Sequence, residues 1–181
     1  MGRAVFLDRD GTINEDAGYI STLDSLKFIP RSVDALRKLQ EYFQLFIVTN
    51  QSGIGRGLFT EGDFLRFNRV FLELLVHQGV FIKEVYYCPH TSQDGCQCHK
   101  PKPYFLLKAQ TEFDINLSVS YVIGDHPSDI EMARNAGARG IYVLTGHGIK
   151  HRHDLSGSTV DMAVDLFEAS RLILSRIDAR F

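Results

Sequence analysis

Six short runs of apolar residues are spread along the chain, separated by longer segments of mixed polarity. Within each run the apolar residues are consecutive, which is typical of β-strands that are covered on both faces of a parallel sheet. The runs lie at 4–7, 45–48, 85–87, 121–123, 141–144 and 162–164. The pattern therefore predicts six strands in one parallel sheet.

Five of the other segments repeat apolar residues with the period of an amphipathic helix. They lie at 32–43, 60–77, 103–113, 127–136 and 165–177. In the second segment, Phe64, Phe67 and Leu74 share the face that we expect to be buried, and Thr60 with Asp63 resembles a capping box. Strands that alternate with helices indicate an α/β fold, and we expect a Rossmann-like, doubly wound sheet.

Composition limits the class of partner. A chain of 181 residues with 44% apolar residues fits one domain with its own core, so we expect 1–181 to form a single unit. The 20 basic and 22 acidic residues give a net charge of −2, which favours neither a nucleic-acid-binding surface nor a disordered polyanion. The sequence contains no signal peptide, no apolar run of about 18 residues and no heptad repeat. We therefore expect a cytoplasmic monomer that binds neither membranes nor nucleic acids.

Polar residues follow three of the predicted strands. Asp8 and Asp10 come after the first strand, Thr49 and Asn50 after the second, and Asp125 after the fourth. In doubly wound sheets, ligands bind outside the carboxyl ends of the strands, so we expect these residues to converge on one site. If the extended geometry persists to Asp10, both of the first two carboxylates leave the same side of the chain, and the residue between them points away.

Four carboxylates, those of Asp8, Asp10, Asp125 and Asp129, would repel one another in such a site. Each pair at 4 Å costs about 1 kcal/mol in water and several times more in a partly dry cleft, so the cluster needs a cation. Oxygen ligands suit Mg²⁺, which commonly bridges to a substrate phosphate. For Asp129 alone, a helix cap is an equally simple explanation.

Donor groups for a phosphate lie in two further places. The segment 49–53, with the sequence Thr-Asn-Gln-Ser-Gly, supplies hydroxyl, amide and backbone donors, and Lys100 supplies a point charge. Taken alone, Thr49 and Asn50 are explained equally well as an ordinary turn. Together with the carboxylates, they indicate a site for a phosphate ester.

Four motifs occur in this order: Asp8-x-Asp10-Gly11-Thr12, Thr49-Asn50-Gln51-Ser52, Lys100-Pro101 and Gly124-Asp125-x-x-x-Asp129. This series resembles the four motifs of the haloacid dehalogenase superfamily of phosphatases, over residues 5–146. The resemblance implies a phosphoric monoester hydrolase in which Asp8 attacks phosphorus and forms an aspartyl-phosphate. It also implies that Asp10 protonates the leaving oxygen and later activates water.

The same resemblance implies the remaining roles in the site. Mg²⁺ is expected to be held by Asp8, the backbone carbonyl of Asp10, and Asp125, with Asp129 just outside the direct ligands. Thr49 and Lys100 are expected to bind the oxygens of the transferring phosphoryl group. Catalysis would then consist mostly of positioning and of charge neutralisation.

All three cysteines of the chain fall within 88–98. With His90 they form the pattern Cys88-x-His90-x5-Cys96-x-Cys98, which matches a closed tetrahedral zinc site. A disulfide is the alternative, but the number of cysteines is odd and the cytosol is reducing. We expect a structural Zn²⁺ that folds this small zinc-binding loop and delivers His99 and Lys100 to the phosphate site.

The cysteine loop narrows the resemblance to a branch that contains heptose bisphosphate phosphatases and histidinol-phosphatase domains, which are capless. The short stretch between Gly11 and Leu45 agrees, because it leaves room for little more than a loop and one helix. The resemblance implies that substrate is bound by Asp16, Gly18, Tyr19, Asn50, Gln51, Ser52, Arg56, His99 and His126. It favours D-glycero-D-manno-heptose 1,7-bisphosphate as the substrate, with histidinol phosphate as the alternative. His99 and His126 replace the Arg and Lys that are usual in the heptose enzymes, so we expect weaker or differently arranged recognition of the second phosphate.

Other interpretations remain open on the sequence alone. A non-catalytic signalling module that is phosphorylated on Asp would also be doubly wound and bind Mg²⁺, but its acceptor follows the third strand, whereas Asp8 follows the first. A zinc-stapled binding protein is a further alternative. His147, His151 and His153 could form a second metal site, but we expect a solvated loop there, because Asp154 is the one partner at ligand spacing.

Overall fold

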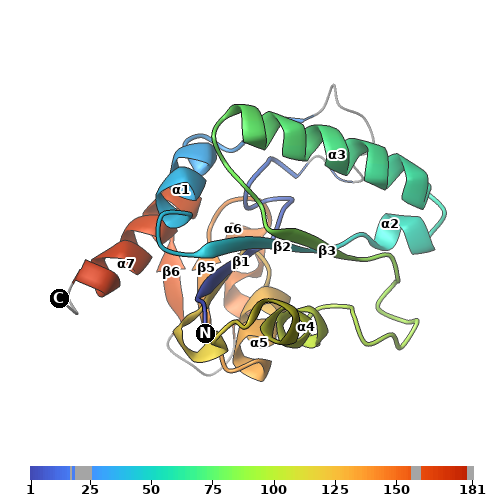
Figure 1. Ribbon diagram of the computed structural model, residues 1–181. Helices are drawn as coiled ribbons and strands as arrows, with labels where there is room; N and C mark the ends of the chain where they lie inside the picture. Colours follow the sequence, from blue (N-terminus) through green and yellow to red (C-terminus); the bar gives the residue numbers. More distant parts are fainter. Residues whose placement is uncertain (17, 19–25, 156–159, 179–181) are drawn as a thin grey trace.

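One sheet of six strands forms the centre of the computed structural model, which describes residues 1–16, 18, 26–155 and 160–178 (Figure 1). The strands are β1 (Ala4–Leu7), β2 (Gln44–Asn50), β3 (Glu84–Cys88), β4 (Tyr121–Gly124), β5 (Arg139–Val143) and β6 (Asp161–Ala163). Their order in the sheet is β3-β2-β1-β4-β5-β6, and every neighbouring pair is parallel. The predicted parallel α/β fold is therefore confirmed.

The described helices include five that follow the predicted segments, with differences at their ends, and two short ones, at 52–55 and 148–151, that were not predicted. They are α1 (Ser32–Leu39), α2 (Ser52–Gly55), α3 (Glu61–His77), α4 (Tyr104–Phe113), α5 (Pro127–Asn135), α6 (Gly148–His151) and α7 (Leu166–Asp178), with 3-10 turns η2 (Leu117–Val119) and η3 (Arg152–Asp154). No described helix combines the length and the apolar character that are needed to cross a membrane.

Two predictions about local structure are wrong. The helix expected at 32–43 ends at Leu39, because Phe43 reaches the core from the turn before β2 and packs edge-on against Tyr121 with ring centroids 5.8 Å apart. The segment around His147 and His151 forms α6 and η3 instead of a loop, although most of its residues are solvent-exposed as expected.

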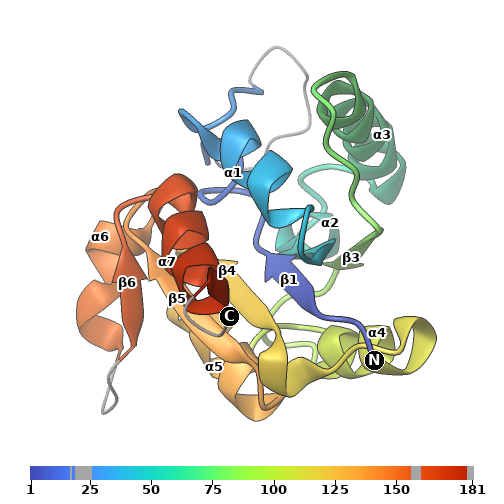
Figure 2. The same ribbon diagram turned by 60° about the vertical axis from the view of Figure 1, so that its left-hand side comes forward.

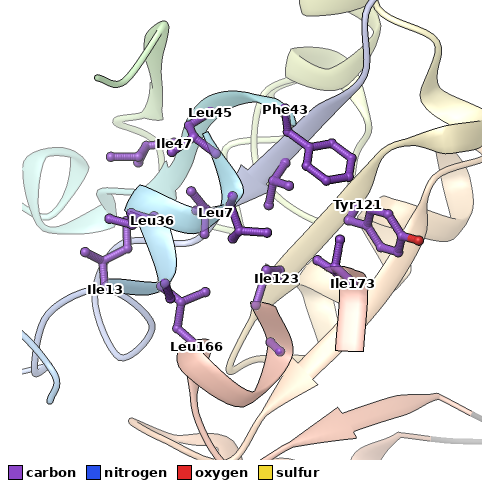
Figure 3. Packing of buried hydrophobic residues seen from close by; sticks show 14 of the residues in the cluster. Leu7, Ile13, Leu36, Phe43, Leu45, Ile47, Tyr121, Ile123, Leu166 and Ile173 are labelled. Atoms are coloured by element: carbon purple, nitrogen blue, oxygen red, sulfur yellow. The ribbon is translucent and has the colours of Figure 1, made fainter. Parts of the chain in front are cut away.

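Helices cover both faces of the sheet (Figures 1 and 2), and alternate residues of the central strands belong to two separate core layers. Val5 and Leu7 belong to the core under α1, α3 and α7, whereas Ala4 and Phe6 belong to the core under α4 and α5. Figure 3 shows side chains from three strands meeting those of α1 and α7 in the first layer. Because both faces are covered, the strands read as continuous apolar runs in the sequence.

Helix α3 begins with the capping box that the sequence predicts. The Thr60 hydroxyl accepts a hydrogen bond from the Asp63 amide at 3.1 Å, and the Asp63 carboxylate accepts one from the Thr60 amide at 2.9 Å. Phe64 and Phe67 are buried as expected, but Leu74 is 40% exposed. Leu74 lies at the margin of the apolar stripe, whereas Phe71 and Leu75 in the same part of the helix are fully buried.

Candidate active site and metal centres

A cavity of about 510 Å³ lies at the carboxyl ends of β1, β2 and β4. The sheet order reverses direction between β1 and β4, and crevices at such switch points are the usual ligand sites of doubly wound sheets. The lining residues are Asp8, Asp10, Asp16, Gly18, Thr49, Asn50, Gln51, Ser52, Gly53, His99, Lys100, Asp125, His126, Ser128 and His147. The fold thus brings most of the predicted site residues together.

Three carboxylates form an acidic cluster, of which Asp8 and Asp125 line this cavity and Asp129 is fully buried beside them. Oxygens of Asp8, Asp125 and Asp129 all lie within 4.8 Å of one another. The Lys100 ammonium lies 2.7 Å from Oδ1 of Asp8 and 2.7 Å from Oδ1 of Asp129. Although burial opposes its charge, these two carboxylates raise the pKa of Lys100, so the ammonium stays charged.

The acidic cluster holds more negative charge than its cation balances. Among the described residues that line the cavity, Lys100 is the one Lys or Arg side chain. Burial, together with the charges of Asp8 and Asp129, raises the pKa of Asp125 to about 8. A raised pKa of this size means that the nearby positive charge is too small to stabilise the ionised form of Asp125. The all-oxygen donor set and this missing charge fit a divalent cation such as Mg²⁺.

Two glycines allow the backbone to close around Asp125. A Cβ at Gly11 or at Gly146 would lie 2.2 Å from Oδ2 of Asp125, and both glycines have positive φ, +85° and +54°. The His147 amide donates to the same oxygen at 2.7 Å. Asp125 is therefore held between the turn after β1 and the segment after β5, which is a position that a larger residue at either glycine would disturb.

Asp129 is both a helix cap and a member of the acidic cluster, the two explanations that the sequence left open. Its Oδ2 accepts a hydrogen bond from the His126 amide at 3.2 Å and completes a capping box at the start of α5. Its Oδ1 accepts the bond from Lys100. One carboxylate thus caps the helix and also fixes the lysine of the site.

The Asp10 carboxylate is not part of the acidic cluster. Arg9 was expected to point away from it, but this prediction is wrong. The Arg9 guanidinium donates to both Asp10 oxygens, from Nε at 3.1 Å and from Nη2 at 2.6 Å. Asn14 and Gln51 donate to the same carboxylate at 2.9 and 3.1 Å. Burial opposes ionisation, but the charge of Arg9 and these hydrogen bonds outweigh it and lower the pKa of Asp10. The strand ends at Leu7 and the chain turns at once, so the alternation of an extended chain does not apply.

The loop after β2 contacts both Asp10 and the residues that follow the cysteine loop. Gln51 donates to the Thr49 hydroxyl at 2.8 Å as well as to Asp10. Asn50 accepts a hydrogen bond from the Lys100 amide at 3.1 Å, and its amide group lies 3.4 Å from Nδ1 of His99. The side chains of this loop therefore set the position of Lys100 from outside its own segment.

The three cysteines are free and, with His90, form a second cluster. Sγ of Cys98 lies 2.9 Å from that of Cys88, 3.6 Å from that of Cys96 and 3.4 Å from Nδ1 of His90. A tetrahedral Zn²⁺ with bonds of about 2.3 Å to sulfur gives ligand separations of about 3.8 Å. The sulfur-rich donor set fits zinc, and the separations of 3.6 and 3.4 Å are close to this value, whereas Cys88 and Cys98 would have to move apart on binding the ion. Burial raises the pKa of the Cys88 thiol, as expected for a thiolate site without its cation.

Some predicted substrate-binding residues are not found in the cavity. Arg56 is exposed at the end of α2 and is not among the described residues that line the cavity, and Tyr19 lies outside the described residues. Conversely, His147 lines the cavity, and its Nε2 lies 2.9 Å from a carboxylate oxygen of Asp16. His147 follows β5, so the strand-end rule that found Asp125 could also have found it.

The histidines at the rim form a short series. The rings of His126 and His151 lie 5.0 Å apart, and those of His147 and His151 lie 6.0 Å apart. His126 also caps α5, because its Nδ1 accepts from the Ser128 amide at 3.3 Å. Burial, with the nearby charges of His151 and Lys100, lowers the pKa of His126.

Several known proteins are similar to this chain in sequence. A family model described as HAD-hydrolase-like matches residues 97–168. The chain is 44% identical over 154 residues, 79% of this chain and 81% of the relative, to a Yersinia pestis protein named D-glycero-beta-D-manno-heptose-1,7-bisphosphate 7-phosphatase. It is 41% identical over 156 residues, 81% of each chain, to the protein of the same name from Escherichia coli K12.

Solved structures agree with the sequence comparison. A D,D-heptose 1,7-bisphosphate phosphatase from B. bronchiseptica, crystallised with magnesium and phosphate, superimposes with a TM-score of 0.89 and 28% identity over 96% of this chain and 99% of that one. The corresponding enzyme from Burkholderia thailandensis gives a TM-score of 0.73 with 27% identity, over 96% and 99% of the two chains. At 44% identity across 81% of the Yersinia pestis relative, this chain belongs to the same family of haloacid dehalogenase-like hydrolases.

Proposed function

We propose that this protein is a Mg²⁺-dependent phosphatase that hydrolyses D-glycero-D-manno-heptose 1,7-bisphosphate to the heptose monophosphate. The observation that carries the proposal is the acidic cluster of Asp8, Asp125 and Asp129 around a single buried lysine, at the switch point of the sheet. The names of the relatives in sequence and in structure support the substrate.

In the proposed first step, a carboxylate oxygen of Asp8 attacks the phosphorus of the ester. The P–O bond to the sugar breaks, its electrons stay with the sugar oxygen, and Asp10 gives that oxygen a proton. In the second step, Asp10 takes a proton from a water molecule that attacks the phosphorus, and Asp8 is released with inorganic phosphate. Asp10 lines the same cavity as Asp8, which supports these two roles.

The phosphoryl group needs positive charge and donors around it. Lys100 is held charged and oriented by Asp129, while Thr49 offers a hydroxyl at the end of β2. Asp8, the Asp10 backbone carbonyl and Asp125 would hold Mg²⁺, with Asp129 beside them, and the ion would neutralise phosphate charge when bound. The positive charge missing from the acidic cluster supports this assignment.

The rest of the cavity is available for the sugar and its second phosphate. Its volume of about 510 Å³ lies within the usual range for small-molecule sites, about 300–1,000 Å³. We propose that Asp16, Gly18, Asn50, Gln51, Ser52, His99 and His126 contact the substrate, because these residues line it. Imidazoles in place of Arg and Lys make His99 and His126 the residues where recognition of the second phosphate differs from that of relatives.

Cys88, His90, Cys96 and Cys98 would hold a structural Zn²⁺, since all four positions of a tetrahedron are filled by protein ligands. The segment leads directly into His99 and Lys100, so folding it places the lysine. Free thiols in a metal-binding arrangement also support a reducing compartment such as the cytoplasm, where we propose that a monomer acts on this small metabolite.

A panel of phosphate esters tests the proposed function. We expect release of inorganic phosphate over many turnovers with Mg²⁺, loss of activity with EDTA, and the highest kcat/KM for heptose 1,7-bisphosphate. A higher kcat/KM for histidinol phosphate would reassign the substrate. A stable phosphorylated protein without turnover would favour a signalling module instead.

A further inference from the structure

We propose that Arg9 is the positioning residue for the acid–base group: its buried guanidinium holds the Asp10 carboxylate in the orientation for proton transfer. The inference rests on the proposed function, because Asp10 needs this support only if an ester is hydrolysed.

The contact between the two residues is bidentate. Nε and Nη2 of Arg9 donate to the two different oxygens of Asp10, at 3.1 and 2.6 Å. Two parallel bonds of this kind fix the plane of a carboxylate as well as its distance, which a single bond cannot do. Asn14 and Gln51 add one bond each, and Gln51 comes from the segment after β2.

Arg9 is itself held rigidly. Its side chain is 1% exposed, and the guanidinium carbon lies 4.9 Å from the ring centroid of Phe67 and 5.5 Å from that of Phe64. Both rings are buried in α3, and the Arg9 carbonyl accepts the amides that form the turn after β1. A guanidinium packed on aromatic faces keeps one orientation, so the carboxylate that it binds does so as well.

Stability alone does not explain this pair. A buried ion pair is weak evidence of stabilisation, because removing both charges from water offsets much of their attraction. In addition, Nη1 of Arg9 is buried without a hydrogen-bond partner in the described part of the chain. The other end of the pair, Asp10, is 18% exposed and lines the cavity. A buried positive charge thus contacts a carboxylate that also borders the cavity.

The proposed role of Arg9 can be tested by comparing substrates whose leaving groups differ in their need for a proton. When Asp10 transfers its proton to a sugar oxygen, its carboxyl group must point at that oxygen, and the bidentate contact with Arg9 keeps it in that orientation. A p-nitrophenolate leaving group is stable without a proton, so its departure does not depend on this transfer. The ratio kcat/KM covers only the steps up to departure of the leaving group, which separates the acid role of Asp10 from its later role as a base.

The experiment measures kcat/KM for heptose bisphosphate and for p-nitrophenyl phosphate in wild type, Arg9→Met, Arg9→Lys, Asp10→Asn and the Arg9→Met/Asp10→Asn double variant. We expect Arg9→Met to lower the value for the sugar ester by about 10²-fold, within the range of general acid catalysis, and the value for the aryl ester by less than about threefold. Arg9→Lys keeps the charge without the bidentate contact, so its kcat/KM for the sugar ester should lie between those of wild type and Arg9→Met. In the Asp10→Asn background, Arg9→Met should have no further effect.

A matched control is the Arg176–Asp161 pair, which is also bidentate, at 2.6 and 2.8 Å, and lies between α7 and β6. Arg176→Met should leave both esters unchanged. Equal losses on the two esters in folded Arg9→Met, or an additional loss in the double variant, would overturn the inference. If Arg9→Met does not fold, Arg9→Lys and the double variant, which removes both charges, decide in the same way. A wild type that hydrolyses neither ester would instead overturn the proposed function.

Discussion

The two candidate metal centres of this protein are built in opposite ways. The sulfur cluster takes all four of its ligands from one short segment, 88–98, which follows β3. The acidic cluster takes its side chains from the ends of β1 and β4 and the first turn of α5, and its lysine is 92 positions from Asp8. The first is complete once a loop has closed, whereas the second exists only when the sheet has its correct strand order.

This difference suggests a division of labour. A site made by one segment can stabilise that segment without help from the rest of the fold, which suits a structural ion. A site made by distant strands is held by the whole core, so its charges are fixed in advance of the substrate, which suits chemistry. We therefore expect damage to the acidic cluster to remove activity and spare the zinc site, and damage to the sulfur cluster to affect both.

The largest effect is expected for Asp8→Asn. An amide cannot attack phosphorus, so kcat should fall by roughly 10⁴-fold or more. Lys100 keeps its bond to Asp129, so circular dichroism and zinc content should match wild type. Retention of more than a trace of the wild-type kcat would remove Asp8 from the role of nucleophile.

Cys98→Ser should lower zinc content and activity together. The Cys98 sulfur lies within hydrogen-bonding distance of three other ligands of the cluster, and a serine hydroxyl is a poor substitute in a zinc site. Since a shift of about 1 Å in a catalytic group can cost 10²-fold in rate, a loosened loop should lower kcat by about that factor through Lys100. Metal analysis and phosphate release measure the two effects.

Asp94→Asn provides the control for this prediction. Asp94 accepts hydrogen bonds from the Thr91 amide and hydroxyl within the same loop but is not a member of the sulfur cluster. It should keep its zinc. Active protein that contains no zinc would contradict the structural role of this metal.

The two centres should also differ in how metal affinity depends on pH. Metal binds the deprotonated ligand, so affinity rises with pH until the ligand is already deprotonated in the metal-free protein. Because burial and two neighbouring carboxylates raise the pKa of Asp125 to about 8, Mg²⁺ affinity should rise up to tenfold per unit below pH 8 and level off above it.

Burial raises the pKa of Cys88 above the ordinary value of a thiol, so zinc affinity should keep rising through pH 9. Titration calorimetry with each metal at several pH values measures both slopes. A pH-independent Mg²⁺ affinity between pH 6 and 8 would contradict the charge state assigned to the acidic cluster.

The sequence predicts much of this molecule because its signals are local or depend on strand order. Continuous apolar runs located the strands, and the residues that follow them located Asp8, Thr49 and Asp125 at one end of the sheet. The contact of Arg9 with Asp10 was missed, since it depends on a turn that begins right after Leu7 and on rings from α3. His147 was missed because α6 looks like a polar loop until its start is seen beside Asp125.

The smallest effect tests the backbone around the acidic cluster. Gly146→Ala places a methyl group where 2.2 Å separates it from Oδ2 of Asp125, so that the carboxylate must move. The Mg²⁺ concentration for half-maximal activity should rise by about tenfold, as for other changes beside metal ligands. Gly79→Ala is the matched control, since Gly79 also has positive φ, +75°, but has nothing within 4 Å of the added carbon. Thermal melts should show a loss of about 1 kcal/mol for Gly79→Ala and a larger loss for Gly146→Ala, because the added carbon at Gly146 also lies 2.5 Å from the Gly11 Cα. Equal Mg²⁺ requirements in the two variants would contradict this prediction, because they would show that Mg²⁺ binding does not depend on the exact position of the Asp125 carboxylate.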